Sequence, residues 1–337
     1  YNSSMTTPLS AMEQLDSYVR LFTDAGFWAP YVREVCGRHG LGCAAIRTGV
    51  PGTCPVFIVD ETWVVKFFGR LFDGAKSAAA EREAGRLAGL DGAIRTAKLA
   101  AWGELGTGVT CPGEWPWPYL IFEYVRGVSI GEVMDRLTRE DRLQAARDLG
   151  ETVRRLHALP LEGSPVFPND HGAYLRFLQG QRAGLAGRLR EWGSLPKRLI
   201  DQVEDFMPPL EALVDRSRPP HLIHADLTRD HLLGRFENGR WASLALIDFG
   251  DARTGSLLYE LAALHLDLFN AEKPLLAAFL DTYGLDAEAR AGLPRKALAT
   301  ALLHQFDVFQ PLRAELANAG SRSEEHTSEL QSPDHLV

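Results

Sequence analysis

The chain has 337 residues, more than one small core usually holds, so two lobes or domains are expected. Its composition is that of an ordinary globular protein, and no apolar stretch reaches the ~18–20 residues that a membrane helix needs. The net charge of −8 argues against nucleic acid as a partner, because phosphates require a basic face, and is compatible with a cationic small molecule.

Both ends of the chain are expected to lie outside the folded part. Residues 1–4 precede Met5, and residues 321–337 are polar and lack helical or strand periodicity, which is typical of disorder. The start also lacks the basic and then apolar pattern of a signal peptide, which favours a cytoplasmic location. No CxxC spacing or paired histidines accompany the cysteines, so buried free thiols are expected at Cys36, Cys43, Cys54 and Cys111.

The first lobe, expected over residues 5–125, consists mainly of strands. PVFIVD and TWVVKFF are β-branched-rich runs joined at Asp60–Glu61, which predicts a hairpin. Residues 75–90, AKSAAAEREAGRLAGL, carry apolar side chains at helical spacing. A further strand is predicted for WPWPYLIFEYV, residues 115–125, which leads into a hinge at about 122–127.

The second lobe, expected over residues 127–320, is mainly helical. Helical patterns occur in EVMDRL, DRLQAARDLGETVRRLHAL and SLPKRLIDQVEDFMPPLEALV. The strand signals are HLIHADL, HLLGRF and SLALIDFG. A β-rich lobe followed by a helical lobe predicts a two-lobed α+β fold.

Two elements of the first lobe carry candidate chemistry. The loop Gly49–Cys54 joins two strands and places Gly52 and Thr53 where they could bind phosphate, although such a loop more often forms only a tight turn. Lys66 lies on the strand TWVVKFF, and Glu83 on the following helix is its expected partner. A lysine held by a helical glutamate is the arrangement that directs an ammonium group onto nucleotide phosphates. Glu81 is the competing partner, but we expect it to point to another face of the helix.

Two further elements follow in the second lobe. HADLTRDHLL contains Asp226, with His231 five residues later, and IDFG contains Asp248. Phosphoryl transfer requires a lysine on the phosphates, a carboxylate near the attacking hydroxyl and Mg²⁺ held by oxygen-rich ligands. Each of these motifs is weak alone, but the ordered set predicts a kinase.

The ordered set resembles the aminoglycoside phosphotransferases, antibiotic kinases that share the protein-kinase fold. Their usual loop is HGDxxxxN, and some members have histidine at its last position, as this chain does. The similarity is closer still to the members that phosphorylate the 7″-hydroxyl of hygromycin B. It is carried, from about residue 27 to 310, by FWAPYVREVCGRHGL, VPGTCPVFIV, VVKFFG, EWPWPYL, LHLDLF and LLHQFDVF.

The resemblance implies a role for each motif residue. Asp226 would be the catalytic base or orienting group, Asp248 and His231 would hold Mg²⁺, and Lys66 would bind the α- and β-phosphates of ATP or GTP. The Glu123 carbonyl and the Val125 amide would bind the nucleotide base. Phe122 would be the gatekeeper, where a bulky side chain favours guanine. His231 is also open to a second interpretation, in which it holds Asp226 by a hydrogen bond.

An aminoglycoside carries several ammonium groups, so its site should be lined by carboxylates. The candidate substrate residues lie beyond IDFG: Asp251, Glu260, Asp267 and Asp307. Glu260 and Asp267 are seven residues apart and would share one helix face, although Glu260 could instead pair within the lobe. His265 and His304 are expected to serve packing.

Two other classes of protein remain open. A kinase for another small hydroxyl compound, such as a macrolide or choline, is the alternative within enzymes. A pseudokinase that only binds nucleotide usually lacks the lysine or one of the two aspartates, whereas Lys66, Asp226 and Asp248 are all present here.

Overall fold

The computed structural model describes residues 9–50, 52–106 and 115–319, which form two compact units. Unit 1 comprises Tyr1–Gly89, Thr96–Arg126 and Asp248–Gly250. Unit 2 comprises Leu90–Arg95, Gly127–Ile247 and Asp251–Val337. None of the helices in the described ranges is long and apolar enough to cross a membrane.

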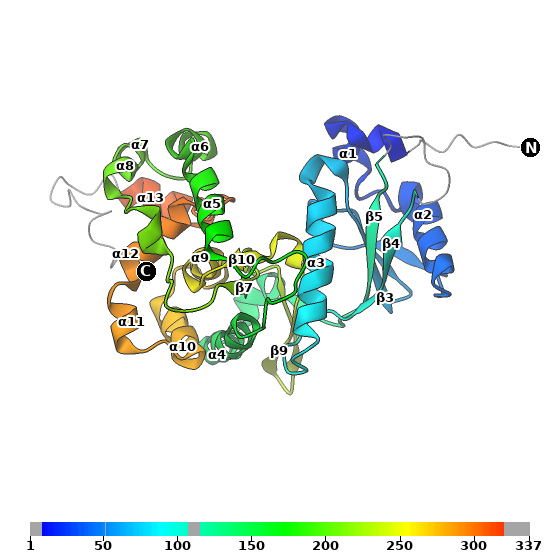
Figure 1. The fold of residues 1–337 in the computed structure, drawn as a ribbon. Coiled ribbons are helices and arrows are strands. Elements are labelled where there is room, and N and C mark those ends of the chain that lie inside the picture. The colour runs from blue at the N-terminus through cyan, green and yellow to red at the C-terminus, as the bar shows by residue number, and fades with distance from the viewer. Residues whose placement is uncertain (1–8, 51, 107–114, 320–337) are drawn as a thin grey trace, which may run out of the picture. The chain divides into compact units, whose positions relative to one another are not determined.

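Unit 1 is built around a five-stranded antiparallel sheet in the order β1-β2-β3-β5-β4. Its strands are β1 (Ile46–Thr48), β2 (Val56–Val59), β3 (Trp63–Phe67), β4 (Leu99–Glu104) and β5 (Pro118–Glu123). Its helices are α1 (Leu15–Leu21), α2 (Ala25–Arg38) and α3 (Gly74–Ala88), with 3-10 turns at Leu9–Glu13 and Arg70–Phe72. Figure 1 shows α2 and α3 on opposite sides of this sheet.

The hairpin predicted at Asp60–Glu61 is confirmed. β2 and β3 pair in antiparallel register from Val56–Lys66 to Val59–Trp63. Both turn residues have positive φ, 51° and 48°, which is the backbone twist that tight hairpins require. The helix predicted for residues 75–90 is α3.

The two faces of the sheet bury different side chains. Trp28 of α2 packs on Phe57 and Phe67, with ring centroids 5.9 and 4.7 Å away. The opposite face carries Phe122, which packs with Ala78 of α3. Side chains alternate along a strand, so Lys66 and its neighbour Phe67 on β3 point to opposite faces. Lys66 therefore lies on the face that carries Phe122.

Unit 2 combines short strands with many helices. Its strands are β6 (Val128–Ser129), β7 (His221–Ile223), β8 (Leu232–Glu237), β9 (Arg240–Leu246) and β10 (Arg253–Gly255). They form one sheet in the order β6-β8-β9 and the pair β10-β7. The first helices are α4 (Arg139–His157), α5 (His171–Arg182), α6 (Leu185–Trp192), α7 (Lys197–Ile200) and α8 (Val203–Phe206). The later helices are α9 (Leu257–Ala263), α10 (Lys273–Tyr283), α11 (Ala287–Ala291), α12 (Leu293–Leu302) and α13 (Arg313–Ala319).

Single turns complete the chain. The 3-10 turns are Gly131–Arg136, Leu210–Leu213, Phe249–Asp251 and Gln310–Leu312, and α9 continues as one π-helical turn, Leu264–Leu268. The helical pattern EVMDRL is thus a 3-10 turn, and SLPKRLIDQVEDFMPPLEALV is divided into α7, α8 and a 3-10 turn. Pro208 and Pro209 explain the end of α8, because proline cannot continue a helix, and Pro196 marks the start of α7. No proline lies between α7 and α8, which are separated by Asp201 and Gln202.

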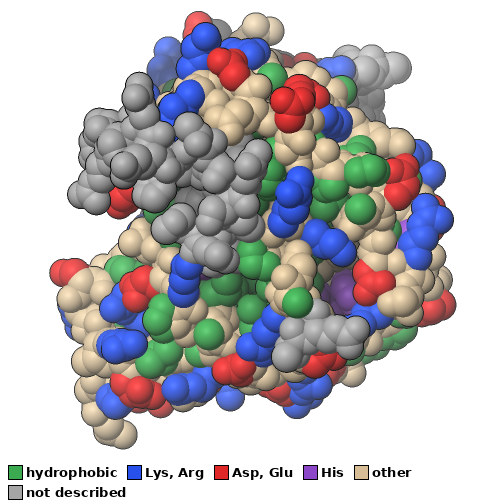
Figure 2. All heavy atoms as spheres, turned by 90° about the vertical axis from the view of Figure 1, so that its left-hand side faces the viewer, with side chains coloured by type: hydrophobic (Ala, Val, Ile, Leu, Met, Phe, Trp, Pro, Cys, Tyr) green, Lys and Arg blue, Asp and Glu red, His purple; other side chains and the backbone are tan. Residues whose placement is uncertain are grey.

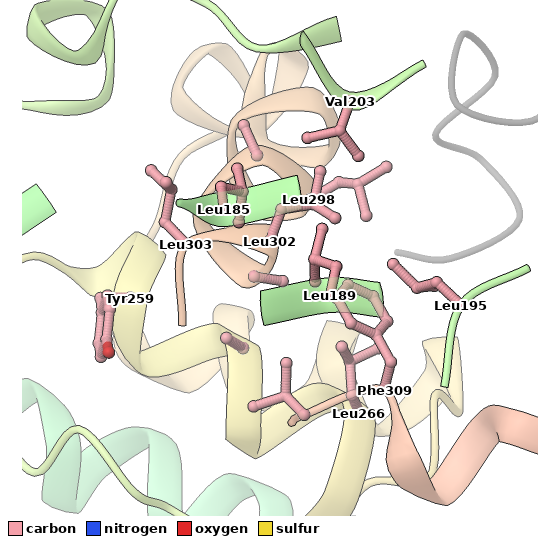
Figure 3. Close-up of a cluster of buried hydrophobic side chains, with 14 of the residues drawn as sticks. Leu185, Leu189, Leu195, Val203, Tyr259, Leu266, Leu298, Leu302, Leu303 and Phe309 are labelled. Carbon is pink, nitrogen blue, oxygen red and sulfur yellow. The ribbon is translucent and has the colours of Figure 1, made fainter. Parts of the chain in front are cut away.

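The main core of unit 2 is a cluster of leucines and aromatic side chains. Figure 3 shows Leu185 and Leu189 of α6 gathered with Leu298 and Leu302 of α12 and with Phe309. Tyr259 of α9 and Ala225 belong to the same cluster. The loop that contains Asp226 therefore lies against a tightly packed core.

The cysteines of the described ranges are free thiols, as expected: Cys36, Cys43 and Cys54. Only Cys36 is buried, whereas Cys43 and Cys54 are partly exposed. Cys111 and the two chain ends, residues 1–4 and 321–337, lie outside the described residues.

Candidate active site

Lys66 forms a buried ion-pair network inside unit 1. Its Nζ donates to Glu81 Oε2 at 2.8 Å and to Asp248 Oδ1 at 2.7 Å. The lysine is 6% exposed, and the ring centroid of Phe68 lies 5.3 Å from its Nζ. A buried ammonium group is tolerated only when paired, and two carboxylates provide that pairing here.

The expected pairing of Lys66 with Glu83 is wrong. Glu83 instead pairs with Arg86, one turn further along α3, with both guanidinium contacts at 2.8 Å. Ala78 and Glu81 are three residues apart and share the helix face that packs on the sheet. Glu83 is two residues from Glu81, about 200° around the helix, and this rotation decides which glutamate reaches Lys66.

The charge of Lys66 is stabilised by its neighbours. Burial alone would favour the neutral amine. The carboxylates of Asp248 and Glu81 outweigh that effect, so that the pKa of Lys66 is raised well above its ordinary value. Lys66 is therefore a permanent positive charge, as a group that binds phosphate must be.

Asp248 begins the turn Asp248–Gly250, which belongs to unit 1. Its φ of 63° lies in the left-handed region, which is uncommon for a residue with a side chain and typical of functional turns. Its side chain is 43% exposed, whereas Phe249 is buried and anchors the turn. The turn thus presents a carboxylate that is held by Lys66 on one side and accessible to solvent.

The predicted nucleotide-base residues lie at the end of β5. Phe122 is 7% exposed on the α3 side of the sheet. The Glu123 amide donates to Lys98 O at 2.8 Å, and its side chain pairs with Lys98 Nζ. The Val125 amide donates no backbone hydrogen bond to any residue that the structure describes.

In the loop Gly49–Cys54, one of the two residues predicted to bind phosphate forms a hydrogen bond. The Thr53 carbonyl accepts a hydrogen bond from the Tyr18 hydroxyl at 2.5 Å. Gly52 is exposed, and a Cβ added there would meet no atom within 4 Å. The loop therefore does not need a glycine at 52 to avoid a clash with the described protein atoms.

The loop His224–His231 follows β7 in unit 2 and is held by a buried carboxylate. Glu260 Oε1 and Oε2 accept the amides of His224 and Ala225, each at 2.8 Å. Ala225 has a φ of 67°, a conformation that costs an alanine roughly 1–2 kcal/mol. The hydrogen bond from the Ala225 amide to Glu260 helps to stabilise this strained backbone immediately before Asp226.

His224 connects the loop to the strand that leads to Asp248. Its Nε2 donates to the Ile247 carbonyl at 2.9 Å, and its Nδ1 accepts the Asp226 amide at 3.3 Å. These contacts require a neutral ring with the proton on Nε2. His224 therefore acts on the loop as a brace.

His231 holds the backbone of Asp226. Its Nδ1 lies 2.6 Å from the Asp226 carbonyl and 3.1 Å from the Thr228 hydroxyl. The carbonyl can only accept, so Nδ1 carries a proton and, in the neutral ring, the lone pair belongs to Nε2. This contact favours the orienting role of His231, and the tautomer leaves Nε2 as the nitrogen suited to a metal.

Glu260 and Asp267 both contact the loop, but they differ in exposure. Glu260 is 1% exposed, which excludes it as a lining residue. Asp267 Oδ1 accepts from the Arg229 amide at 2.8 Å and from the Arg229 Nε at 3.2 Å. Both acids contact the loop, and the burial of Glu260 replaces its expected substrate role by a positioning role. The side chain of Asp267 is 22% exposed, so its substrate role stays a prediction.

Asp251 and Asp307, the other two candidates, lie near one segment of unit 2. Asp251 Oδ1 accepts from Gln305 Nε2 at 2.7 Å, and Asp307 Oδ2 accepts from Ser194 Oγ at 2.5 Å. His304, in the same segment, contacts the Ala225 carbonyl through Nε2 at 3.1 Å. The segment 304–307 therefore lies beside the Asp226 loop.

The sequence analysis ranked Glu81 below Glu83, did not single out Gln305 and misassigned Glu260. The signal for Glu81 was its three-residue spacing from the apolar Ala78. Nothing local marks Gln305, because its partner Asp251 is 54 residues away in the chain.

The donors present fit a magnesium ion at Asp248. In the described ranges no group of three or more His, Cys, Asp or Glu side chains forms a metal cage. Magnesium seldom uses such a cage, since it retains waters and binds one or two carboxylates plus substrate phosphates. The half-exposed carboxylate of Asp248 satisfies that requirement, whereas the imidazole of His231 is a poorer ligand for this ion.

Known proteins share this architecture. The fold is similar to that of an APH(2″) enzyme solved with GDP and kanamycin, at 18% identity over 90% of this chain and 98% of that chain, with a TM-score of 0.62. A macrolide 2′-phosphotransferase of type I matches at 19% identity over 92% and 96%, with a TM-score of 0.50. A microcompartment-associated aminopropanol kinase matches at 16% identity over 91% and 99%, with a TM-score of 0.55.

A curated relative and a family model complete the comparison. The relative is the lysine-specific demethylase JMJ21 of Arabidopsis thaliana, 25% identical over 203 residues that represent 50% of this chain. This chain spans only 22% of that relative's length. Residues 55–298 match the model of the phosphotransferase enzyme family, APH. The predicted two-lobed α+β kinase fold is confirmed, and this chain belongs to the phosphotransferase enzyme family.

Proposed function

We propose that this phosphotransferase transfers the γ-phosphate of ATP or GTP to a hydroxyl of a cationic aminoglycoside, with hygromycin B or a relative as acceptor. The observation that carries the proposal is the buried Lys66–Glu81–Asp248 network, because it provides a fixed ammonium and a half-exposed carboxylate in one place. Solved structures of similar fold include an enzyme bound to GDP and kanamycin.

The nucleotide is assigned to residues of unit 1. The Lys66 ammonium binds the α- and β-phosphates, and the Glu123 carbonyl and Val125 amide bind the base. Gly52 and Thr53 are assigned to the phosphates through their loop. Asp248, with His231 Nε2 as a second candidate donor, would hold Mg²⁺. When bound, that ion neutralises charge on the phosphate oxygens.

The acceptor is assigned to the Asp226 loop. The acceptor oxygen forms a bond to the γ-phosphorus, the bond to the β-phosphate oxygen breaks, and the nucleoside diphosphate leaves. The Asp226 carboxylate orients the hydroxyl and takes its proton. Asp251 and Asp307 are the proposed partners of substrate ammonium groups.

The test is a coupled nucleotide-turnover assay with ATP or GTP and a panel of acceptors: hygromycin B, kanamycin, a macrolide and choline. Asp226→Asn should lower kcat by roughly 10²–10⁴-fold, the usual contribution of a general base. Asp230→Asn, which changes an exposed acid of the same loop, is the matched control and should retain activity within about twofold. Turnover by Asp226→Asn at the wild-type rate would refute the mechanism.

The same panel tests the alternative acceptor class. The similar folds include a macrolide 2′-phosphotransferase and an aminopropanol kinase, so a macrolide or a small amino alcohol is the second candidate. Turnover confined to one of these acceptors would replace the aminoglycoside proposal. Absence of turnover with every acceptor, together with measurable nucleotide binding, would favour a pseudokinase.

The role of His231 is tested by its magnesium dependence. His231→Asn retains a ligand oxygen, and His231→Ala removes all donors. If His231 binds the ion, His231→Ala should raise the Mg²⁺ concentration needed for half-maximal rate, and His231→Asn should restore it. If the magnesium dependence of His231→Ala is unchanged, His231 does not bind the ion, and its role is limited to the hydrogen bond with the Asp226 carbonyl.

Nucleotide preference is tested at Phe122. Because its ring occupies the proposed gatekeeper position, Phe122→Ala should shift the ratio of kcat/KM for GTP and ATP towards ATP. An unchanged ratio would exclude Phe122 as the determinant.

A further inference from the structure

A cavity in unit 2 lies apart from the residues assigned to phosphoryl transfer. It encloses about 490 Å³, within the ~300–1,000 Å³ of small-molecule sites. Its walls come from the start of α5, the segment 211–220, the junction of β10 with α9, the end of α10 and the start of α12. None of Asp226, His231, Asp251 or Asp307 lines it.

The rim of the cavity is basic although the chain is acidic. Arg216, Arg218 and Lys296 line it, opposed by Glu211 and Asp215. The net charge of the chain is −8, so this local excess of positive charge is a departure from the average. Figure 2 shows one face of the molecule, where Lys and Arg side chains are interspersed with Asp, Glu and hydrophobic side chains.

Part of the rim charge is available to a ligand. Asp215 is engaged by the amide and hydroxyl of Ser217, at 2.9 and 2.6 Å, and lies 3.9 Å from Arg218. Among the described residues, Arg216 and Lys296 form no ion pair at contact distance, although the charge of Lys296, after the hydrogen bonds from Ser217, contributes to the lowered pKa of Asp215. These two side chains are exposed and can turn towards an anion.

The inner wall is apolar, with aromatic rings at its base. His221, Leu258 and Leu285 are partly exposed to the cavity. Tyr283 is 8% exposed, and Leu213 and Tyr174 are buried behind them. A wall of this kind favours a flat apolar body, and the basic rim favours a negative group at one end. The cavity is therefore suited to an aromatic organic anion.

Two residues of the cavity wall, Tyr283 and His221, contact His157, which lies near the carboxylate that holds the Asp226 loop. His157 Nδ1 lies 2.9 Å from the Tyr283 hydroxyl, and the ring of His157 stacks on His221 with centroids 4.8 Å apart. His157 Nε2 lies 3.7 Å from Glu260 Oε1. Glu260 in turn accepts the amides of His224 and Ala225. The path from the cavity wall to the loop therefore consists of hydrogen bonds and ring stacking, except at the step from His157 to Glu260, which is an electrostatic approach without a hydrogen bond.

We propose that this cavity binds an aromatic organic anion, and that its occupancy stabilises the backbone of the Asp226 loop through His157 and Glu260. A ligand that packs on Tyr283 and His221 restrains the groups that hold His157, and hence the carboxylate that holds the loop. The proposal concerns binding and backbone stability and is independent of the acceptor and nucleotide.

Binding is tested by calorimetric titration of the full chain with 2-naphthyl phosphate, using 2-naphthol and inorganic phosphate as partial probes. The whole compound should bind at least tenfold more tightly than either part. Arg216→Ala with Lys296→Ala should weaken its binding at least tenfold. Arg139→Ala with Lys273→Ala, two exposed cations of unit 2 outside the cavity, is the matched control and should leave the affinity unchanged.

Binding at the proposed phosphate site is distinguished by Lys66→Met, which should retain the affinity for 2-naphthyl phosphate. Loss of binding in Lys66→Met, or equal affinity in the Arg216/Lys296 variant and wild type, would overturn the site. So would the absence of saturable binding.

Coupling is tested by hydrogen–deuterium exchange of the peptide that contains His224 and Ala225. Saturating 2-naphthyl phosphate should slow exchange of these amides at least fivefold, because amides exchange only when their hydrogen bonds open. His157→Gln and Tyr283→Phe should keep binding and reduce that protection. Binding without any change in exchange would overturn the coupling, whatever the outcome of the activity assays.

Discussion

At the scale of single residues, the role of Lys66 depends on which glutamate pairs with it. Either Glu81 or Glu83 of α3 could pair with it, and both are 6% exposed. The 2.8 Å contact assigns Glu81 to the lysine, and Glu83 is occupied by Arg86. The two glutamates therefore form a natural matched pair for experiment.

Glu81→Gln should lower activity far more than Glu83→Gln. A hydrogen bond to a buried charge contributes about 1.5–3 kcal/mol, so loss of the Glu81 carboxylate should reduce kcat/KM for the nucleotide roughly 10–100-fold. Glu83→Gln removes a pair with a half-exposed arginine, which contributes about 0–1 kcal/mol, and should reduce it less than about fivefold. Steady-state kinetics with varied nucleotide measure both, and the reverse order would contradict the assignment.

At the scale of elements, α9 determines the position of the Asp226 loop. Its residue Glu260 is buried, and burial alone would favour the neutral acid. Its contacts with His157 and the amide of His224 outweigh burial and hold the pKa of Glu260 below its ordinary value. A charged carboxylate thus connects α9 with the backbone that precedes Asp226.

Glu260→Gln should separate positioning from substrate binding. A glutamine offers only one oxygen for two amides, so one buried N–H loses its partner at a cost of about 1–3 kcal/mol. We expect kcat to fall more than about tenfold, acceptor KM to change less than about twofold, and the free energy of unfolding to fall. Glu315→Gln, an exposed glutamate on α13, is the control. An increase in acceptor KM with unchanged kcat would support a substrate role for Glu260 instead.

At the scale of the whole molecule, buried neutral histidines make stability depend on pH. Burial lowers the pKa of His304 to about 4, and burial with repulsion from His157 lowers the pKa of His221 to about 4. The unfolded chain, with ordinary histidines, binds more protons between about pH 4 and 6.5. Folding is therefore favoured above pH 6.5, and this contribution is lost as the pH falls towards 4.

The free energy of unfolding should fall by about 2 kcal/mol for His304 alone between pH 7.5 and 5. His304→Gln does not titrate but can still donate to the Ala225 carbonyl and accept the Phe306 amide, so its pH dependence should be shallower by that amount. Urea unfolding at several pH values measures both curves. Parallel curves for wild type and variant would show that His304 is not the titrating group.

Much of this protein was predictable from local pattern. The β-branched-rich apolar runs on either side of Asp60–Glu61 determine the hairpin, and regular apolar spacing determines α3, because both patterns are properties of consecutive residues. The order of Lys66, Asp226 and Asp248 indicated a kinase fold before any contact was known, and the family comparison agrees with it.

Only the tertiary structure decided which acid serves which partner. The sequence favoured Glu83 over Glu81 for Lys66 and assigned Glu260 and Asp267 a substrate role, whereas the observed partners depend on helix rotation and long-range packing. Glu260 reaches His224 across 36 residues, and Asp267 reaches Arg229 across 38, distances over which no spacing rule applies. Hydrogen-bond partners depend on where side chains meet after folding, whereas strands and helices depend on neighbours in the chain.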